Sequence, residues 1–531
     1  MAEQFQSPRV HAIVVLLKAG YGQDWLGRWV FERVGTGWSV CPVPFHPRGD
    51  EFDVVPQAGV EPARAWDFAR ELRALDGVVD AEPTFEALYE ESAVQGPTGA
   101  DPDITPRSLA YGSAGGTADA GSACDWSVKF VQAEEAWALP DCVSRYGQGI
   151  RVGHPDSGYR AHPELGADFN PGPGWDFING DSATENVQGD HGLETASVIS
   201  SADNRSENER SITGIAAQAE VIPLRVTKPH SFVPAPVLFE AGATRLRDAI
   251  RYALTLEPPC HVLSISLGWL PDGGLHRALQ DAVQQNVIVI AAAGNYTGRI
   301  VVWPAAYPEA IAMAACNAQG APWWGSARGP AVDATGPGEG VWVANVAQYV
   351  AQSDGTSFAV ATIAGIAALW LAYHGRDNLL ARYAGGPLLS EVFRQVLCAS
   401  CTSWEQDPGL WGAGLVNARG CLQAPLPDPA AVQGAPAVAA GPVEETFPTI
   451  PAPRLHESLA RVLGVKRAAI EPILAEHGRE LRFWLLTQPD FRRALAESFI
   501  PAMEPVVTAQ RAALPPFSDG LHEALRANAS T

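Results

Sequence analysis

The chain has 531 residues, of which 47% are apolar, so it is long enough to bury a large core and to form more than one domain. Its formal net charge of −22 argues against nucleic acid as a partner, because neutralising phosphates requires clustered Lys and Arg. Eight cysteines are too few for a disulfide scaffold at this length. Cys398 and Cys401 form a lone CxxC pair, which favours helix packing over a zinc or redox site.

Targeting signals are not evident in the sequence. The N-terminus, MAEQFQSPRVHAIVVLLKAG, has no basic segment that leads into an apolar stretch with a small-residue cleavage site. No later apolar run is expected to reach membrane-spanning length. The sequence therefore predicts a cytoplasmic protein with no membrane partner.

Residues 1–90 carry the pattern of a small αβ domain. Strand-like runs at residues 11–17 and 78–82 flank a helical stretch at residues 62–75. Residues 91–124 follow and are rich in Gly, Ser, Ala, Pro and Asp without apolar periodicity. We interpret this second segment as a flexible linker that proteases can reach.

Residues 125–423 alternate between strand and helix patterns. The apolar runs GIRVGHPD, AEVIPLRV, CHVLSISLG and VIVIAAAGN are each followed by helical or loop sequence. This alternation predicts an α/β fold, a mostly parallel sheet with helices on both faces. Ligands of such sheets bind beyond the carboxyl ends of the strands.

The C-terminal region divides into a linker rich in Ala, Pro and Val, residues 424–453, and a helical domain, residues 454–531. Helices are predicted at residues 454–462, 465–477, 480–488 and 490–499, with breaks at Gly464, Gly478 and Pro489. Two interpretations stay open: a stabilising appendage, or a domain for oligomerisation or for recruiting a protein partner.

Three motifs carry the residue types that activate a serine hydroxyl, which needs a base and an orienting carboxylate. In GIRVGHPDSGYRAHPEL, an apolar strand ends at Asp156. In GDHGLETASVISS, His191 lies in the first turn of a predicted helix. In DGTSFAVATIAGIAALW, Ser357 opens an apolar helix whose free amides suit a developing oxyanion. Taken singly, each has a structural alternative: a turn Asp, a helix-start His and an N-cap Ser.

Together the motifs resemble the subtilase family, because the order Asp, His, Ser along one α/β domain is the subtilisin order. The stretches GIAAQAEVIPLRV, SISLG, VIAAAGN, PAAYPEAIAMAA, SARGP and WGAGLVNA add matches in the same order. The resemblance implies a serine endopeptidase in which Asp156 orients His191, and His191 takes the proton from Ser357. It implies a protein or peptide substrate; we expect no cofactor, and no acidic loop indicates a metal site.

The resemblance also assigns residues around the reacting serine. Asn295, in AAAGN, matches the family's side-chain oxyanion donor, which works with the backbone amide of Ser357. The candidates for binding an extended substrate backbone lie in SISLG and AAAG: Ser266, Leu267, Gly268 and Gly294. In VVWPAAYP, Val302 stands where the family often has Gly at the pocket base. A branched residue there is expected to favour small P1 side chains.

Some positions depart from the family pattern. After His191 the family usually reads Gly-Thr-His-Val-Ala-Gly, whereas this chain reads Gly-Leu-Glu-Thr-Ala-Ser. After Ser357 it reads Phe-Ala-Val-Ala where Met, Ala, Thr and Pro are common. None of these changes removes a reacting group, so we expect an active enzyme.

The N-terminal segment ELRALDGVVDAEPTFEALY resembles the end of a subtilisin propeptide. The resemblance implies that residues 88–90 lie across the active-site cleft as a product-like inhibitor. It also predicts self-cleavage between about Tyr89 and Cys124. Two alternatives to a regulated protease stay open: a catalytically silent scaffold that binds through its cleft and C-terminal helices, and an acyl transferase that uses an amine in place of water.

Overall fold

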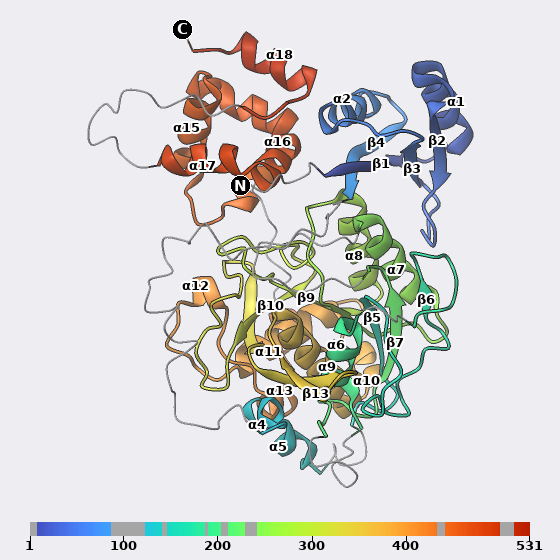
Figure 1. The fold of residues 1–531 in the computed structure, drawn as a ribbon, viewed down its shortest axis with the longest axis vertical. Coiled ribbons are helices and arrows are strands. Elements are labelled where there is room, and N and C mark those ends of the chain that lie inside the picture. Colours follow the sequence, from blue (N-terminus) through green and yellow to red (C-terminus); the bar gives the residue numbers. More distant parts are fainter. Residues whose placement is uncertain are drawn as a thin grey trace. The chain divides into compact units, whose positions relative to one another are not determined.

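The computed structural model describes residues 8–86, 123–140, 146–185, 189–202, 211–228, 242–432, 441–499 and 514–530 (Figure 1). Its contacts divide the chain into two compact units. The central unit comprises Glu90–Trp269 and Gly274–Ala437, and the terminal unit comprises Met1–Tyr89, Leu270–Gly273 and Val438–Thr531.

A seven-stranded sheet forms the core of the central unit, in the order β11-β10-β9-β8-β5-β7-β6. The strands are β5 (Arg151–Asp156), β6 (Trp175–Asp176), β7 (Glu220–Arg225), β8 (Val262–Ile265), β9 (Ile288–Ala292), β10 (Ile311–Cys316) and β11 (Val332–Pro337). Every neighbouring pair is parallel. The predicted α/β class is therefore confirmed. A separate antiparallel hairpin joins β12 (Val341–Asn345) to β13 (Tyr349–Ser353).

The described helices that accompany these strands are α4 (Trp126–Phe130), α5 (Ala133–Trp137), α6 (His191–Ser200), α7 (Ala243–Thr255), α8 (Gly273–Gln284), α9 (Thr356–His374), α10 (Arg376–Arg382), α11 (Leu389–Ser400), α12 (Pro408–Trp411) and α13 (Ala418–Gln423). Helix α9 packs against strands β5 and β8 to β11. Small residues allow this close packing: a Cβ added at Gly365 would lie 2.6 Å from Ile215 Cβ.

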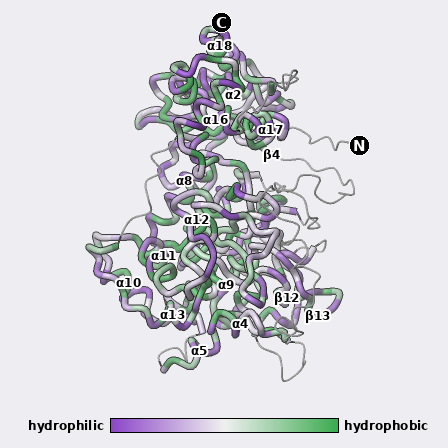
Figure 2. Tube along the Cα trace, turned by 90° about the vertical axis from the view of Figure 1, so that its left-hand side faces the viewer, coloured by the Kyte–Doolittle hydropathy of each residue, from purple (hydrophilic) through white to green (hydrophobic). Residues whose placement is uncertain are grey.

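Helix α9 corrects one expectation from the sequence. By length and composition it could cross a membrane, with a mean hydropathy of 1.6, although no run was expected to reach that length. Its apolar window is 94% buried inside the protein, within the central unit (Figure 2). An apolar helix of this kind is typical of a protein core, because neighbouring elements cover it on all sides.

The αβ subdomain of the terminal unit, residues 8–86, contains a four-stranded antiparallel sheet in the order β2-β3-β1-β4. Its elements are β1 (Arg9–Leu17), α1 (Gln23–Val34), β2 (Trp38–Pro42), β3 (Glu51–Pro56), α2 (Pro62–Arg73) and β4 (Val78–Glu86). The sequence patterns predicted β1, α2 and β4. They did not predict α1, β2 and β3, which lie between β1 and α2.

The helical subdomain of the terminal unit consists of α14 (Pro442–Thr446), α15 (Ala452–Leu463), α16 (Ile470–Thr487), α17 (Pro489–Glu497) and α18 (Asp519–Ala527). The expected break at Gly478 is wrong, because α16 runs through it. A Cβ added at Gly478 would lie 3.4 Å from Pro442 Cδ, which is an ordinary van der Waals distance, so α16 packs against the start of α14 at this glycine. The sequence analysis predicted separate domains at the two ends of the chain. The contacts in the structure group the αβ and helical subdomains in one unit.

Candidate active site

Strand β5 ends at Asp156, whose side chain is buried. Its Oδ1 accepts a hydrogen bond of 2.6 Å from the backbone amide of Ser157 and lies 2.7 Å from His191 Nδ1. Because β5 lies inside the parallel sheet, its last residue reaches the carboxyl edge where ligands of such sheets bind. The carboxylate is thus held by two partners on one oxygen.

His191 is the first residue of helix α6. Its Nδ1 faces Asp156, and its Nε2 lies 3.1 Å from Ser357 Oγ. The next residue must be glycine, since a Cβ at Gly192 would lie 1.8 Å from the Gly158 carbonyl oxygen. This close approach brings the start of α6 against the loop after β5, so that the imidazole bridges the carboxylate and the serine.

The buried pair of Asp156 and His191 shifts the pKa of each member. Burial alone would raise the pKa of Asp156, but the charge and hydrogen bond of His191 outweigh it and lower that pKa below its usual value. Burial would lower the pKa of His191, but Asp156 outweighs it and raises that pKa. Neutral His191 can therefore donate through Nδ1 to Asp156 while Nε2 accepts the proton of Ser357 Oγ.

Ser357 is the second residue of helix α9. Only 2% of its surface is exposed. The 19-residue helix directs the positive end of its dipole and its free backbone amides toward this first turn. Negative charge that develops next to Ser357 is stabilised there.

Asn295 follows strand β9 and is fixed through its amide oxygen. Its Oδ1 accepts hydrogen bonds from Thr356 N at 3.0 Å and from Thr356 Oγ1 at 2.8 Å. The Nδ2 group lies on the other side, beside Gly355: a Cβ added at Gly355 would be 3.6 Å from both Asn295 Nδ2 and Ser357 N. Two N–H donors therefore flank one small region next to the serine.

The five candidates for substrate binding lie in two segments after β8 and β9 and in the loop that follows. Ser266 Oγ donates to the carbonyl oxygen of Ser357 at 3.1 Å, so this hydroxyl supports the helix start. Val302 lies between the segments: a Cβ at Gly268 would be 2.5 Å from Val302 Cγ2, and one at Gly294 would be 3.0 Å from Val302 Cγ1. Leu267 and Val302 are both buried.

Sequence reasoning missed a second polar pair behind Asp156. His154 Nε2 lies 2.9 Å from Thr195 Oγ1 and 3.8 Å from Asp156 Oδ2, and Thr195 Oγ1 lies 3.3 Å from the same oxygen. Burial lowers the pKa of His154, which favours its neutral form. The available signal was Thr195 at a position where the family usually has Val, together with a His two residues before Asp156.

No group of three or more His, Cys, Asp or Glu residues suited to a metal ion occurs in the part of the chain that the structure describes. The thiols of Cys398 and Cys401 lie at the end of α11, and burial raises the pKa of each to about 12. Such a thiol is a poor redox nucleophile, because the reactive species is the thiolate.

Comparison with known proteins assigns the family. The model of the subtilase family matches residues 147–403. Thermitase from Thermoactinomyces vulgaris is 31% identical over 252 residues, which cover 46% of this chain and 81% of thermitase. Subtilisin Savinase and subtilisin BL, both from Lederbergia lenta, are 29% and 28% identical over 55% of this chain and 96% of each relative. The chain belongs to the subtilase family and is a subtilisin-like serine endopeptidase.

Proposed function

We propose that Asp156, His191 and Ser357 are the catalytic triad of this endopeptidase. The observation that carries the proposal is the position of His191, whose two ring nitrogens lie 2.7 Å from Asp156 Oδ1 and 3.1 Å from Ser357 Oγ. Both distances are within hydrogen-bond reach, as a nucleophile, its base and the orienting group require. A silent scaffold would have no need for this alignment.

In the proposed reaction, His191 Nε2 takes the proton of Ser357 Oγ as this oxygen attacks the substrate carbonyl. Asn295 Nδ2 and the amide of Ser357 donate to the oxyanion of the tetrahedral intermediate. His191 then returns the proton to the leaving amine, which departs and leaves an acyl group on Ser357. Water, deprotonated by His191, attacks the ester and releases the acid product.

The substrate backbone is proposed to extend along the segments that contain Ser266, Leu267, Gly268 and Gly294, as an added strand. The Ser266 hydroxyl already donates to the carbonyl oxygen of Ser357. The backbone of Ser266, and not its side chain, is therefore proposed to bind the substrate. Val302 fills the space between these segments, which supports a shallow pocket and a preference for small P1 side chains.

The αβ subdomain is proposed to regulate the enzyme as a propeptide. Its antiparallel sheet and two helices precede the catalytic region in the sequence, as a propeptide would. Residues 88–90, the expected inhibitory segment, and most of the predicted cleavage region before Cys124 lie outside the described residues. A cytoplasmic location and a protein partner for the helical subdomain are further proposals that rest on the sequence.

The test compares the full-length protein with its Ser357→Ala variant by intact mass and by labelling with a fluorophosphonate probe. Labelling and linker cleavage in the wild type alone would support a self-processing serine protease. Trimming of the variant without added protease would contradict self-cleavage. Wild-type protein that neither labels nor cleaves a peptide would favour the scaffold, and amide products with an added amine would favour acyl transfer.

A further inference from the structure

An aromatic cluster joins the two ends of the chain within the terminal unit. Phe483 of α16 stacks on Phe85 of β4, with ring centroids 4.2 Å apart and an interplanar angle of 21°. Trp66 of α2 lies 6.1 Å from each of these rings. All three side chains are buried. Burial of large aromatic surfaces is a main source of interface stability.

Ion pairs lie beside the aromatic cluster. Arg479 Nη1 of α16 lies 2.9 Å from Asp80 Oδ1 and 3.2 Å from Glu82 Oε2, both on β4. Glu82 is buried, and burial raises its pKa although Arg479 and Arg482 act in the opposite direction. Removing the arginine partner of a buried carboxylate is strongly unfavourable. Arg479 is one of two arginines whose charges favour ionised Glu82, so the N-terminal sheet gains electrostatic support from a residue almost 400 positions away.

The αβ subdomain also supplies acceptors to the start of α18, beside its N-cap Ser518, whose Oγ accepts from Leu521 N at 3.2 Å. Asp67 Oδ2 accepts a hydrogen bond of 2.9 Å from Asp519 N, and Asp67 Oδ1 accepts one of 3.0 Å from Gly520 N. These are first-turn amides of α18, which have no partner inside the helix. A Cβ at Gly520 would lie 2.6 Å from Arg70 Nε, so the start of α18 lies directly against the guanidinium of Arg70 on α2. The two elements fit each other closely.

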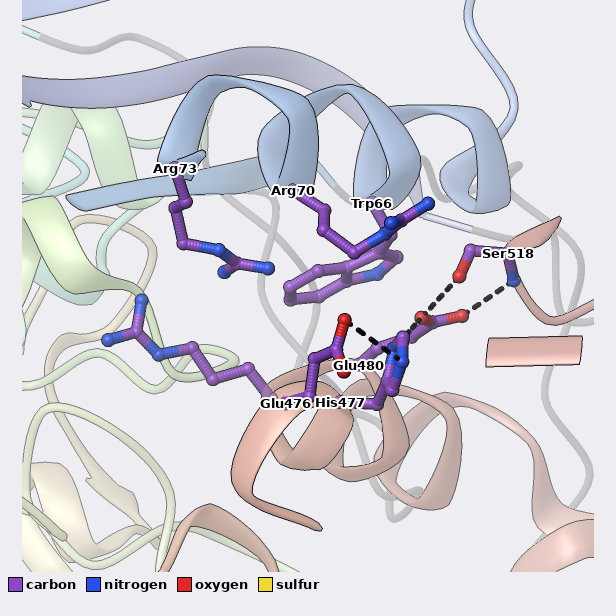
Figure 3. Close-up of a pocket in the computed structure, with 8 residues that line it drawn as sticks. Trp66, Arg70, Arg73, Glu476, His477, Glu480 and Ser518 are labelled. Carbon is purple, nitrogen blue, oxygen red and sulfur yellow. Dashed lines mark hydrogen bonds and ion pairs between the residues drawn. The ribbon is translucent and has the colours of Figure 1, made fainter. Parts of the chain in front are cut away.

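Figure 3 shows the cavity that remains where α2 faces α16 and Ser518. Trp66, Arg70 and Arg73 point into it from the αβ subdomain. On the opposite wall, Ser518 donates to buried Glu480 through its N and Oγ, both at 2.7 Å. Both partners of these two hydrogen bonds belong to the helical subdomain.

We propose that α16 and α18 form a permanent docking surface for the αβ subdomain, so that cleavage within residues 91–124 leaves this subdomain bound to the protease. The helices that form this surface remain covalently joined to the central unit. A cut αβ fragment that stays bound to them is therefore kept at high local concentration near the central unit. The inference deepens the proposed propeptide function and rests on it. The αβ subdomain is then a retained regulatory subunit, and release requires opening of the α2–α16 and α2–α18 contacts.

The experiment inserts the recognition sequence of a specific protease between residues 99 and 100 of the full-length Ser357→Ala protein. After cutting, the expected result is one peak in size-exclusion chromatography at about 0.15 M salt that contains both fragments by intact mass. Elution of the N-terminal fragment as a separate peak would overturn the proposal. Because the protein is inactive, the result does not depend on self-cleavage, and the two proposals can fail independently.

Variants identify the surface. Arg479→Glu and Asp67→Ala, each in the cut protein, are expected to speed release of the fragment at least tenfold. Arg526→Glu is the matched control: it reverses an exposed charge on α18, and retention should be unchanged. Pairing Arg479→Asp with Asp80→Arg should restore retention, which a misfolded helical subdomain would not do. Equal release from Arg479→Glu and Arg526→Glu would contradict this surface.

Discussion

Val302 occupies the space that a side chain at Gly268 would need, since a Cβ there would lie 2.5 Å from Val302 Cγ2. We expect Val302→Ala to deepen the pocket and to raise kcat/KM for Phe at P1 relative to Ala by roughly 10-fold or more, the usual value of added apolar space. The measurement uses peptide substrates that differ only at P1. Val301→Ala, at an adjacent buried valine, is the control. Equal P1 ratios in both variants would contradict the assignment.

The pKa of His191 predicts the pH profile. Below this pKa the imidazole is protonated and cannot accept the proton of Ser357, so kcat/KM should fall as the pH drops through a value above the ordinary 6.5 or so. Asp156→Asn removes the charge that raises this pKa. We expect the acid limb to move to lower pH and kcat to fall by about 10⁴. An unmoved acid limb in the variant would show that another group controls it.

Asn295 is predicted to act only on the transition state. Loss of such a donor costs about 10²–10³ in kcat, as measured in subtilisin itself, and KM should change little. Asn295→Asp keeps the oxygen that accepts both bonds from Thr356, so its thermal stability should stay near that of the wild type. Asn295→Ala should lose activity and some stability. Steady-state kinetics and thermal unfolding together separate the two roles, and wild-type kcat in both variants would exclude the donor.

Thr195 and His154 are predicted to position and polarise Asp156. Thr195→Val removes a hydroxyl that lies 2.9 Å from the carbonyl oxygen of His191 and 3.3 Å from Asp156 Oδ2. Without this polar neighbour the carboxylate is more basic toward His191. The acid limb of kcat/KM should therefore shift to higher pH, and Thr195→Ser should restore it. Ser200→Ala removes a buried hydroxyl bonded to Ala196 O on the same helix and is the control. A purely structural role would change stability and leave the pH profile in place.

His261 is expected to make the fold acid-sensitive. Burial, with the nearby charges of Arg376 and Arg151, lowers its pKa to about 4, and its Nδ1 accepts from Arg151 N at 3.1 Å. The folded-state pKa lies below the unfolded value, so this stability is present above about pH 6.5 and is lost as the pH falls toward 4. The loss is on the order of 3 kcal/mol. His261→Asn keeps an acceptor and should flatten the dependence of unfolding free energy on pH between 7 and 5; an unchanged slope would contradict this.

The sequence alone determined the α/β class, the family and the segments that carry Asp156, His191 and Ser357. These features are local. An apolar strand that ends in a carboxylate, or a small-residue helix that begins at a serine, can be recognised within about ten to twenty consecutive residues. The same local logic failed at Gly478, because α16 runs through this residue from Ile470 to Thr487. A glycine inside a helix costs only about 1 kcal/mol relative to alanine, which the buried contacts of α16 can offset.

Only the tertiary structure decided which distant groups meet. Asp156 and Ser357 lie on opposite sides of one imidazole, and Thr195 reaches the back of Asp156, because β5, α6 and α9 converge at one sheet edge. Arg479 bonds to Asp80 across 399 positions and makes one unit of the two ends of the chain. Such contacts leave no periodic trace in the sequence, since they depend on how buried surfaces and charges fit after the chain has folded.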